Sequence, residues 1–135
     1  MFRVPVSVKV VPLGVVVVVP AWNFPYLIAV NAVVPALMAG NAVVMKPSAL
    51  TLLSGERFAS AFEAAGLPKG LFACIHLDHA ATGQLVQDAR VDYVAFTGSV
   101  AGGRAVQRAA RERFIGIGLE LGGKDPAYVR EDADV

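Results

Sequence analysis

The chain alternates short apolar runs rich in β-branched residues with longer segments in which apolar residues recur at helical spacing. The run "GVVVVVP" at Gly14–Pro20 is continuously apolar, which is typical of a strand covered on both faces. The same criteria predict further strands at residues 41–47, 71–77, 91–98 and 115–121, and helices at residues 26–38, 51–68, 80–89 and 99–114. Because the strands alternate with helices, the predicted fold class is α/β, with a doubly wound, mostly parallel sheet of about five strands and helices on both faces.

Composition agrees with this fold and excludes several classes of partner. Apolar residues make up 56% of the 135 and charged residues 17%, which fits one domain whose sheet is buried on both faces. The net charge of +1 arises from 12 basic and 11 acidic residues without a block of one sign, so no nucleic acid or anionic membrane is expected as a partner. The single cysteine, Cys74, cannot form an internal disulfide, and a cytoplasmic location is expected.

Residues 10–45 contain no charged side chain, which raises two membrane-related alternatives. Phe24–Met45 has the roughly 20 residues that a transmembrane helix needs, but proline, asparagine and glycine interrupt it. A signal peptide would use Arg3 and Lys9 as its basic part and "LGVVVVV" as its apolar core. The valines favour a strand over a helix, so we expect neither.

Ligands of doubly wound sheets bind beyond the carboxyl ends of the strands. This rule selects the segments "PAWN", "KPSA", "HLDH", "FTGS" and "ELGG", each of which follows or closes a predicted strand. Any site for chemistry is therefore expected among these five segments.

The stretch "FTGSVAGG" places Gly98 at a strand end and Ser99 at a helix start, with Gly102 and Gly103 in the first helical turn. Glycines allow a phosphate to approach the backbone closely, and a helix N-terminus attracts anions. The stretch predicts either a pyrophosphate site or a helix-packing turn, because no GxGxxG fingerprint follows any strand. Lys46 would lie at the same edge of the sheet, where a lone lysine is commonly solvated.

Two polar residues are candidates for a catalytic role. Asn23 is held between two prolines, and a rigid carboxamide can donate a hydrogen bond to an oxyanion, although the local sequence favours Asn23 as the cap of the next helix. Glu120 lies between two leucines and is followed by two glycines. If Glu120 is buried there, its ionised form is disfavoured, which suits a general base; a paired structural glutamate is the alternative.

The segment "HLDH" contains the only two histidines of the chain, His76 and His79, on either side of Asp78. A metal site would be short of ligands there, so no metal is expected. Cys74 lies within a predicted strand without a base or helix N-terminus to activate it. It is therefore interpreted as a small core residue.

Five segments in one order resemble the aldehyde dehydrogenase superfamily: "PLGVVVVVPAWNFP", "PALMAGNAVVMKPSALT", "AGLPKG", "VDYVAFTGSVAGGR" and "LELGGKDPAYVREDADV". The resemblance spans the chain from about Pro12 to Val135 and covers the central part of a family member. It implies that residues 1–135 form a single, truncated NAD(P)-binding domain of Rossmann-like type, without the catalytic-cysteine domain.

The resemblance also implies roles for individual residues. In such enzymes a cysteine thiolate attacks an aldehyde, and a hydride passes to NAD or NADP. Asn23 matches the carboxamide that holds the oxyanion, Glu120 the base that activates water, and Lys46 the lysine that reaches the adenosine ribose. The cofactor-binding residues that it implies are Trp22, Lys46, Ser48, Gly98, Ser99, Gly103 and Leu121.

The chain departs from the family pattern in three respects. The nucleophilic cysteine and its Gly-Gln-x-Cys context do not occur, and Cys74 does not match that position. Ala49 stands where NAD-preferring members often carry a glutamate, which leaves NAD and NADP both open, with Lys46 and Ser48 facing a 2′-phosphate if NADP binds. Leu77 and His79 replace a turn near the adenine that is usually rich in glycine.

We therefore expect an aldehyde dehydrogenase-type oxidoreductase fragment that is inactive alone and acts on a small-molecule aldehyde only in the complete enzyme. The alternative is a noncatalytic nucleotide-binding or subunit-interaction module. Apolar surfaces that a larger protein would cover are expected to drive self-association or binding of a partner subunit.

Overall fold

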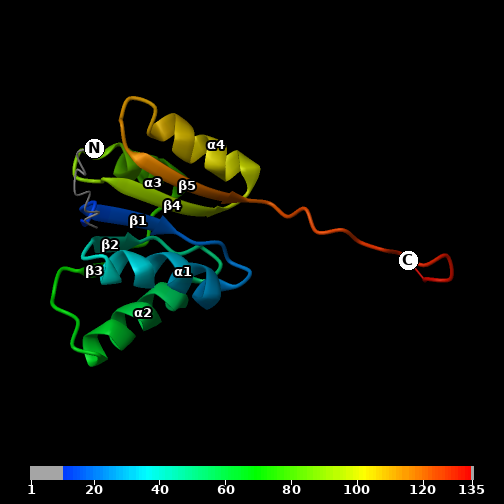
Figure 1. Cartoon of the computed structure of the whole chain (residues 1–135), viewed down its shortest axis with the longest axis horizontal. Coiled ribbons are helices and arrows are strands. Elements are labelled where there is room, and N and C mark those ends of the chain that lie inside the picture. Colours follow the sequence, from blue (N-terminus) through cyan, green and yellow to red (C-terminus); the bar gives the residue numbers. More distant parts are fainter. Residues whose placement is uncertain (1–10, 135) are drawn as a thin grey trace, which may run out of the picture.

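The computed structural model describes residues 11–134, and Figure 1 shows a central sheet between two layers of helices. Its strands are β1 (Val15–Val19), β2 (Ala42–Met45), β3 (Phe72–Cys74), β4 (Tyr93–Gly98) and β5 (Gly116–Leu121). Its helices are α1 (Pro25–Met38), α2 (Leu52–Ala64), α3 (His79–Gln87) and α4 (Val100–Ala109). Each element overlaps with one that the sequence pattern predicts.

The sheet is wound in two directions from its central strand. All neighbouring strands are parallel, in the order β3-β2-β1-β4-β5. Val17 in β1 is paired with Val44 on one side and with Val94 on the other. The chain therefore proceeds from β1 outward to β3, returns to the other side of β1, and proceeds outward again to β5. The predicted doubly wound α/β class is confirmed.

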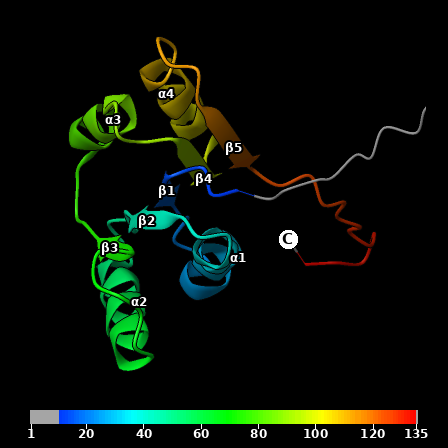
Figure 2. The same ribbon diagram turned by 60° about the vertical axis from the view of Figure 1, so that its left-hand side comes forward.

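Two apolar cores lie on opposite faces of this sheet, under α1 and α2 on one face and under α3 and α4 on the other (Figures 1 and 2). Val16 and Val18 point into the first core, whereas Val17 and Val19 point into the second. All four are buried, because successive side chains of a strand alternate between its faces. Each buried valine contributes on the order of 1.5–3 kcal/mol to folding.

Several elements are shorter than predicted, among them β3 and α4. The strand predicted at residues 71–77 ends at Cys74, because the neighbouring strand β2 ends at Met45, which pairs with Cys74. The helix predicted at residues 99–114 ends at Ala109, and residues 110–113 form turns instead. Arg113 in this turn donates hydrogen bonds to main-chain carbonyls at the end of α3, which fixes the two helices to each other.

The membrane-related alternatives receive no support from the described residues. Phe24–Met45 is divided between α1, a turn and β2, and no helix within residues 11–134 is long and apolar enough to cross a membrane. The valine run of the signal-peptide alternative forms β1. Arg3 and Lys9, its basic residues, lie outside the described part of the chain.

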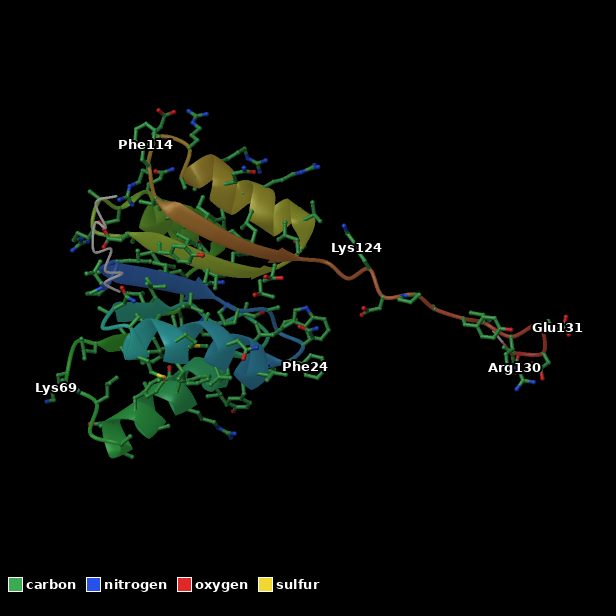
Figure 3. The ribbon with its side chains drawn as sticks, viewed as in Figure 1. Phe24, Lys69, Phe114, Lys124, Arg130 and Glu131 are labelled. Atoms are coloured by element: carbon green, nitrogen blue, oxygen red, sulfur yellow. The ribbon has the colours of Figure 1, made fainter. Side chains whose placement is uncertain are left out.

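Residues 122–134 leave the domain as an extended segment after β5 (Figure 1). Gly122 has a φ of 64°, which glycine adopts without strain, and it turns the chain away from the sheet. Figure 3 shows Lys124 near the domain and Arg130 and Glu131 far from it.

Candidate functional site

The carboxyl ends of the strands meet at one edge of the molecule, and a cavity of about 1140 Å³ lies there. In Figure 3, Phe24 and Lys124 lie at this edge, whereas Lys69 and Phe114 lie at the opposite one. The volume lies slightly above the range of typical ligand sites, which are roughly 300–1,000 Å³. The cavity thus lies where doubly wound sheets bind their ligands.

The structure brings eight of the nine sequence-predicted site residues to this cavity. They are Trp22, Asn23, Lys46, Ser48, Gly98, Ser99, Glu120 and Leu121. The exception, Gly103, is buried between α4 and β5, where an added Cβ would lie 2.6 Å from Leu121 Cδ2. Gly103 therefore allows the helix to pack closely on the strand, and the preceding residue, Gly102, lines the cavity instead.

The turn from β4 to α4 has the geometry of an anion site. Ser99 is the N-cap of α4, and its Oγ accepts a hydrogen bond of 3.1 Å from the amide of Gly102. A Cβ on Gly98 or Gly102 would lie 2.8 Å or 2.5 Å from the ring of Phe96. A Cβ at either position would have to displace this ring, and both glycines line the cavity at a helix N-terminus, where the helix dipole favours anions.

Lys46 follows β2 and is buried rather than solvated as a lone surface lysine would be. Its amide donates to the carbonyl of Val18 at 2.9 Å, and its side chain lines the cavity while the residue is only 7% exposed. Burial lowers the pKa of Lys46, and the nearby carboxylate of Asp78 partly opposes this shift. A buried cation that faces a cavity is well placed to meet an anionic ligand.

Trp22 and Asn23 occupy the loop between β1 and α1, and both are exposed. The residue in the N-cap position of α1 is Phe24, and no side chain caps this helix. The capping alternative for Asn23 is therefore wrong. Asn23 and Glu120 both line the cavity.

Glu120 is exposed, which corrects the expectation that its neighbouring leucines bury it. Leu119 packs toward α4, and strand alternation turns Glu120 to the opposite face. No helix of the described residues covers β5 on that face, where a second hollow of about 660 Å³ lies beside α1. Glu120 lines both this hollow and the cavity at the carboxyl edge.

The residues of "HLDH" have separate roles. Nε2 of His76 lies 2.7 Å from Oε1 of Glu56, Asp78 caps α3 by accepting from the amide of Ala81 at 2.7 Å, and His79 lines the cavity. Residues 11–134 contain no cluster of three or more side chains suited to a metal.

Cys74 lies at the end of β3 against α2 and does not line the cavity. Burial raises the pKa of its thiol, and the carboxylate of Glu56 raises it further. Both effects keep the thiol protonated, so it is a poor nucleophile, as its sequence position predicts.

One wall of the cavity was not predicted from the sequence. His79, Thr82, Gly83 and Val86 of α3 all line it. Their spacing of three and four residues places them on one helix face. That spacing is visible in the sequence, but it identifies a shared face without identifying what the face meets.

The model of the aldehyde dehydrogenase family matches residues 4–135. The chain is 45% identical over 130 residues to 3,6-anhydro-alpha-L-galactose dehydrogenase of Streptomyces coelicolor, covering 96% of this chain and 26% of that protein.

Two solved structures resemble its fold. A 3,6-anhydro-L-galactose dehydrogenase in complex with NAP has a TM-score of 0.83 at 38% identity, over 92% of this chain and 26% of that one. An NAD-dependent aldehyde dehydrogenase from Sinorhizobium meliloti has a TM-score of 0.82 at 41% identity, over 86% of this chain and 23% of that one. The chain thus spans about a quarter of the length of these proteins.

Proposed function

The chain belongs to the aldehyde dehydrogenase family, and from this premise we propose that its cavity is the NAD(P) site of an enzyme that oxidises an aldehyde to a carboxylic acid. We further propose that the chain forms a single dinucleotide-binding domain. The observation that carries the proposal is the convergence of Lys46, the Gly98–Ser99 turn and Glu120 on one cavity at the carboxyl edge. A dinucleotide bound there would accept a hydride from the substrate carbon.

The residues present fit a dinucleotide. Gly98 and Gly102 present bare backbone at the N-terminus of α4, which suits a pyrophosphate. Lys46 and Ser48 offer a cation and a hydroxyl at the end of β2, where an adenosine ribose would lie. A structure in complex with NAP and an NAD-dependent enzyme among the relatives support this fit.

Two residues at the other end of the cavity are assigned chemical roles. The carboxamide of Asn23 donates a hydrogen bond to the oxyanion that forms when the substrate carbonyl is attacked. The carboxylate of Glu120 accepts a proton from the water that hydrolyses the thioester, which forms once the attacked carbon has lost its hydride. Both side chains are exposed at the carboxyl edge, so a substrate and a water molecule can reach them.

The attacking thiolate is not assigned to Cys74, because this cysteine does not line the cavity and its thiol is kept protonated. We expect the 135 residues to bind the dinucleotide without oxidising an aldehyde. Residues 22–38 expose several large apolar side chains, among them Trp22, Phe24, Leu27 and Met38. These support the proposal that the chain associates with itself or with a partner subunit.

Calorimetric titration with NAD and NADP tests the proposal. Trp22 is the single tryptophan of the chain and lines the cavity, so its fluorescence gives a second readout of binding. Lys46→Met, which keeps the side-chain stem, should weaken binding by about tenfold or more. Lys69→Met is the matched control, because Lys69 is exposed at the opposite edge (Figure 3) and should leave affinity unchanged. A folded chain that binds neither dinucleotide would contradict the proposal.

A further inference from the structure

The α3 wall of the cavity is held at its two ends by different contacts. At its C-terminal end, Arg113 donates hydrogen bonds to the main-chain carbonyls of Asp88 and Ala89. At its N-terminal end, α3 continues from the connection at residues 75–78, which joins β3 to α3. Figure 2 shows that this connection passes from the face of the sheet that carries α2 to the face that carries α3. The position of the wall at this end therefore depends on what fixes the connection.

The main chain of the connection is hydrogen-bonded only at its two ends. At one end, the amide of Ile75 donates to the carbonyl of Met45 at 2.9 Å. At the other end, the carbonyl of Asp78 accepts from the amide of Thr82 at 3.0 Å. Between them, residues 76–77 form no main-chain hydrogen bond within the described part of the chain. The middle of the connection is therefore held by side chains.

His76 provides such a contact with α2. Its Nε2 lies 2.7 Å from Oε1 of Glu56. The helix that carries Glu56 is itself fixed, because Phe58 and Phe62 pack on Phe72 of β3 with ring centroids 6.4 Å and 4.9 Å apart. The side chains of His76 and Glu56 are 38% and 59% exposed, so either can be replaced without opening the core.

The residues that follow His76 belong to the cavity side of the connection. Asp78 caps α3 by accepting from the amide of Ala81 at 2.7 Å, and its carboxylate stabilises the charged form of the buried Lys46. His79, the first residue of α3, lines the cavity. A displacement of His76 would thus move both the cap of α3 and the first residue of its cavity face.

We propose that His76 and Glu56 are positioning residues, whose contact fixes the connection to α2 and thereby holds the N-terminal end of α3 in place beside the cavity. Neither side chain lines the cavity, so both act through Asp78 and His79. The expected effect on dinucleotide affinity rests on the proposed function, whereas the expected effect on α3 does not.

Amide hydrogen exchange of the full chain without a ligand, followed residue by residue by NMR, tests the effect on α3. The reporters are the amides of Ala81 and Thr82, which both donate to Asp78. His76→Ala and Glu56→Ala should each speed exchange at the reporters by about two- to fivefold, the size expected for one half-exposed ion pair. The double variant should add little to either single change, because both remove the same contact.

A conservative variant and a neighbouring one serve as controls. His76→Gln places an amide nitrogen as many bonds from the backbone as Nε2 of histidine, so it should restore most of the protection. Arg57→Ala should leave the reporters unchanged, because Arg57 follows Glu56 in α2 but donates to the hydroxyl of Tyr26 in α1 at 3.1 Å. Amides of α4 give an internal reference, since a loss of overall stability would speed exchange there as well.

Calorimetric titration with NAD and NADP tests the effect on the cavity. His76→Ala and Glu56→Ala should each weaken binding of both dinucleotides by up to about fivefold, because the fraction of chains with α3 in the binding position falls. His76→Gln should bind nearly as tightly as the unchanged chain.

The outcomes separate this proposal from the proposed function. The positioning role would be overturned if neither single variant changed exchange at the reporters, if Arg57→Ala changed it as much, or if exchange in α4 rose equally. Faster exchange at the reporters with unchanged dinucleotide affinity would overturn the effect on the cavity and support the effect on α3. Absence of binding by the unchanged, folded chain would overturn the proposed function and leave the exchange result standing.

Discussion

Gly55→Ala should destabilise the chain, although it introduces the best helix-forming residue into α2. Gly55 is buried where α2 crosses β3, and an added Cβ would overlap with Sγ of Cys74 and lie 3.1 Å from Cγ of Pro47. The ring of Pro47 is rigid and fully buried, and it directly follows Lys46. The clash can therefore be relieved by moving the Cys74 side chain, by moving α2 outward or by displacing the loop that carries Lys46.

The two opposing effects have known sizes. Alanine is favoured over glycine in a helix interior by about 1 kcal/mol. Overpacking a core costs roughly 1–3 kcal/mol, and contact with both a sulfur atom and a rigid ring places Gly55→Ala near the upper end. The net loss of unfolding free energy should thus be about 1–2 kcal/mol. With a urea slope of about 2 kcal/mol per molar, the unfolding midpoint falls by about 0.5–1 M.

Two further variants make the measurement decisive. Gly83→Ala has no atom within 4 Å of its added Cβ, so it should keep the helix gain and raise stability by roughly 0.5–1 kcal/mol. Adding Cys74→Ala to Gly55→Ala removes the overlapping sulfur, and the pair should show a coupling of about 1–2 kcal/mol. Urea unfolding followed by circular dichroism gives the unfolding free energies of these variants and of Cys74→Ala alone, which the coupling also requires. If Gly55→Ala stabilises the chain as Gly83→Ala does, or if the coupling is zero, α2 does not approach β3 as described.

Four shorter predictions address other parts of the molecule. Asn41→Leu should lower the unfolding free energy by roughly 2–4 kcal/mol in urea, because the buried carboxamide accepts two main-chain hydrogen bonds before β1 and donates one to the end of α1; a loss well below 1 kcal/mol would contradict this. Hydrogen bonds from Arg90 hold the pKa of Asp88 far below its usual range. The stability that Asp88 contributes is therefore fully present above the pKa of an aspartate in the unfolded chain, and it is lost only as the pH falls through the pKa of Asp88 in the folded chain. Arg90→Gln should therefore raise the pH of acid unfolding seen by circular dichroism, and an unchanged midpoint would argue against the pairing. Burial lowers the pKa of Lys46, and a bound phosphate favours its charged form, so dinucleotide binding at alkaline pH should take up protons, measured as a heat that depends on the buffer. Heats that are equal in all buffers would exclude Lys46 as the phosphate's partner. Light scattering should show association of the purified chain, and a stable monomer would exclude it.

The helices and strands were predictable because each has its own hydrophobic periodicity and is bounded by turn-forming residues. The valine run of β1 and the glycine that follows α1 are local signals, and both elements form where these signals place them. The length of β3 was not predictable, because it depends on how far β2 extends beside it. Asn41 was missed as well, since its sequence position after Gly40 is that of an ordinary turn residue and its three hydrogen bonds join segments far apart.

The site was predictable to the extent that strand ends define it. In a parallel sheet every strand end reaches one edge, so residues after β1, β2, β4 and β5 meet there without further information. The sequence could not show whether Gly102 or Gly103 lines the cavity. The two glycines are adjacent in one helical turn, and only the position of Leu121 decides that Gly103 packs inward.

The alternation of side chains along β5 determines the face of the sheet on which Glu120 lies, but it does not determine whether Glu120 is buried. The alternation along β5 fixes that Leu119 faces α4 and that Glu120 shares the other face with Gly116 and Gly118. The side chain of Tyr93 lies over both glycines, since a Cβ on Gly116 would lie 2.7 Å from its ring and a Cβ on Gly118 2.7 Å from its hydroxyl, whereas Glu120 is exposed. Burial of the carboxylate requires an element over β4 and β5, whereas α1 packs on β1 and β2. The direction in which Glu120 points is thus a local property of the strand, and its surroundings depend on what the open face meets.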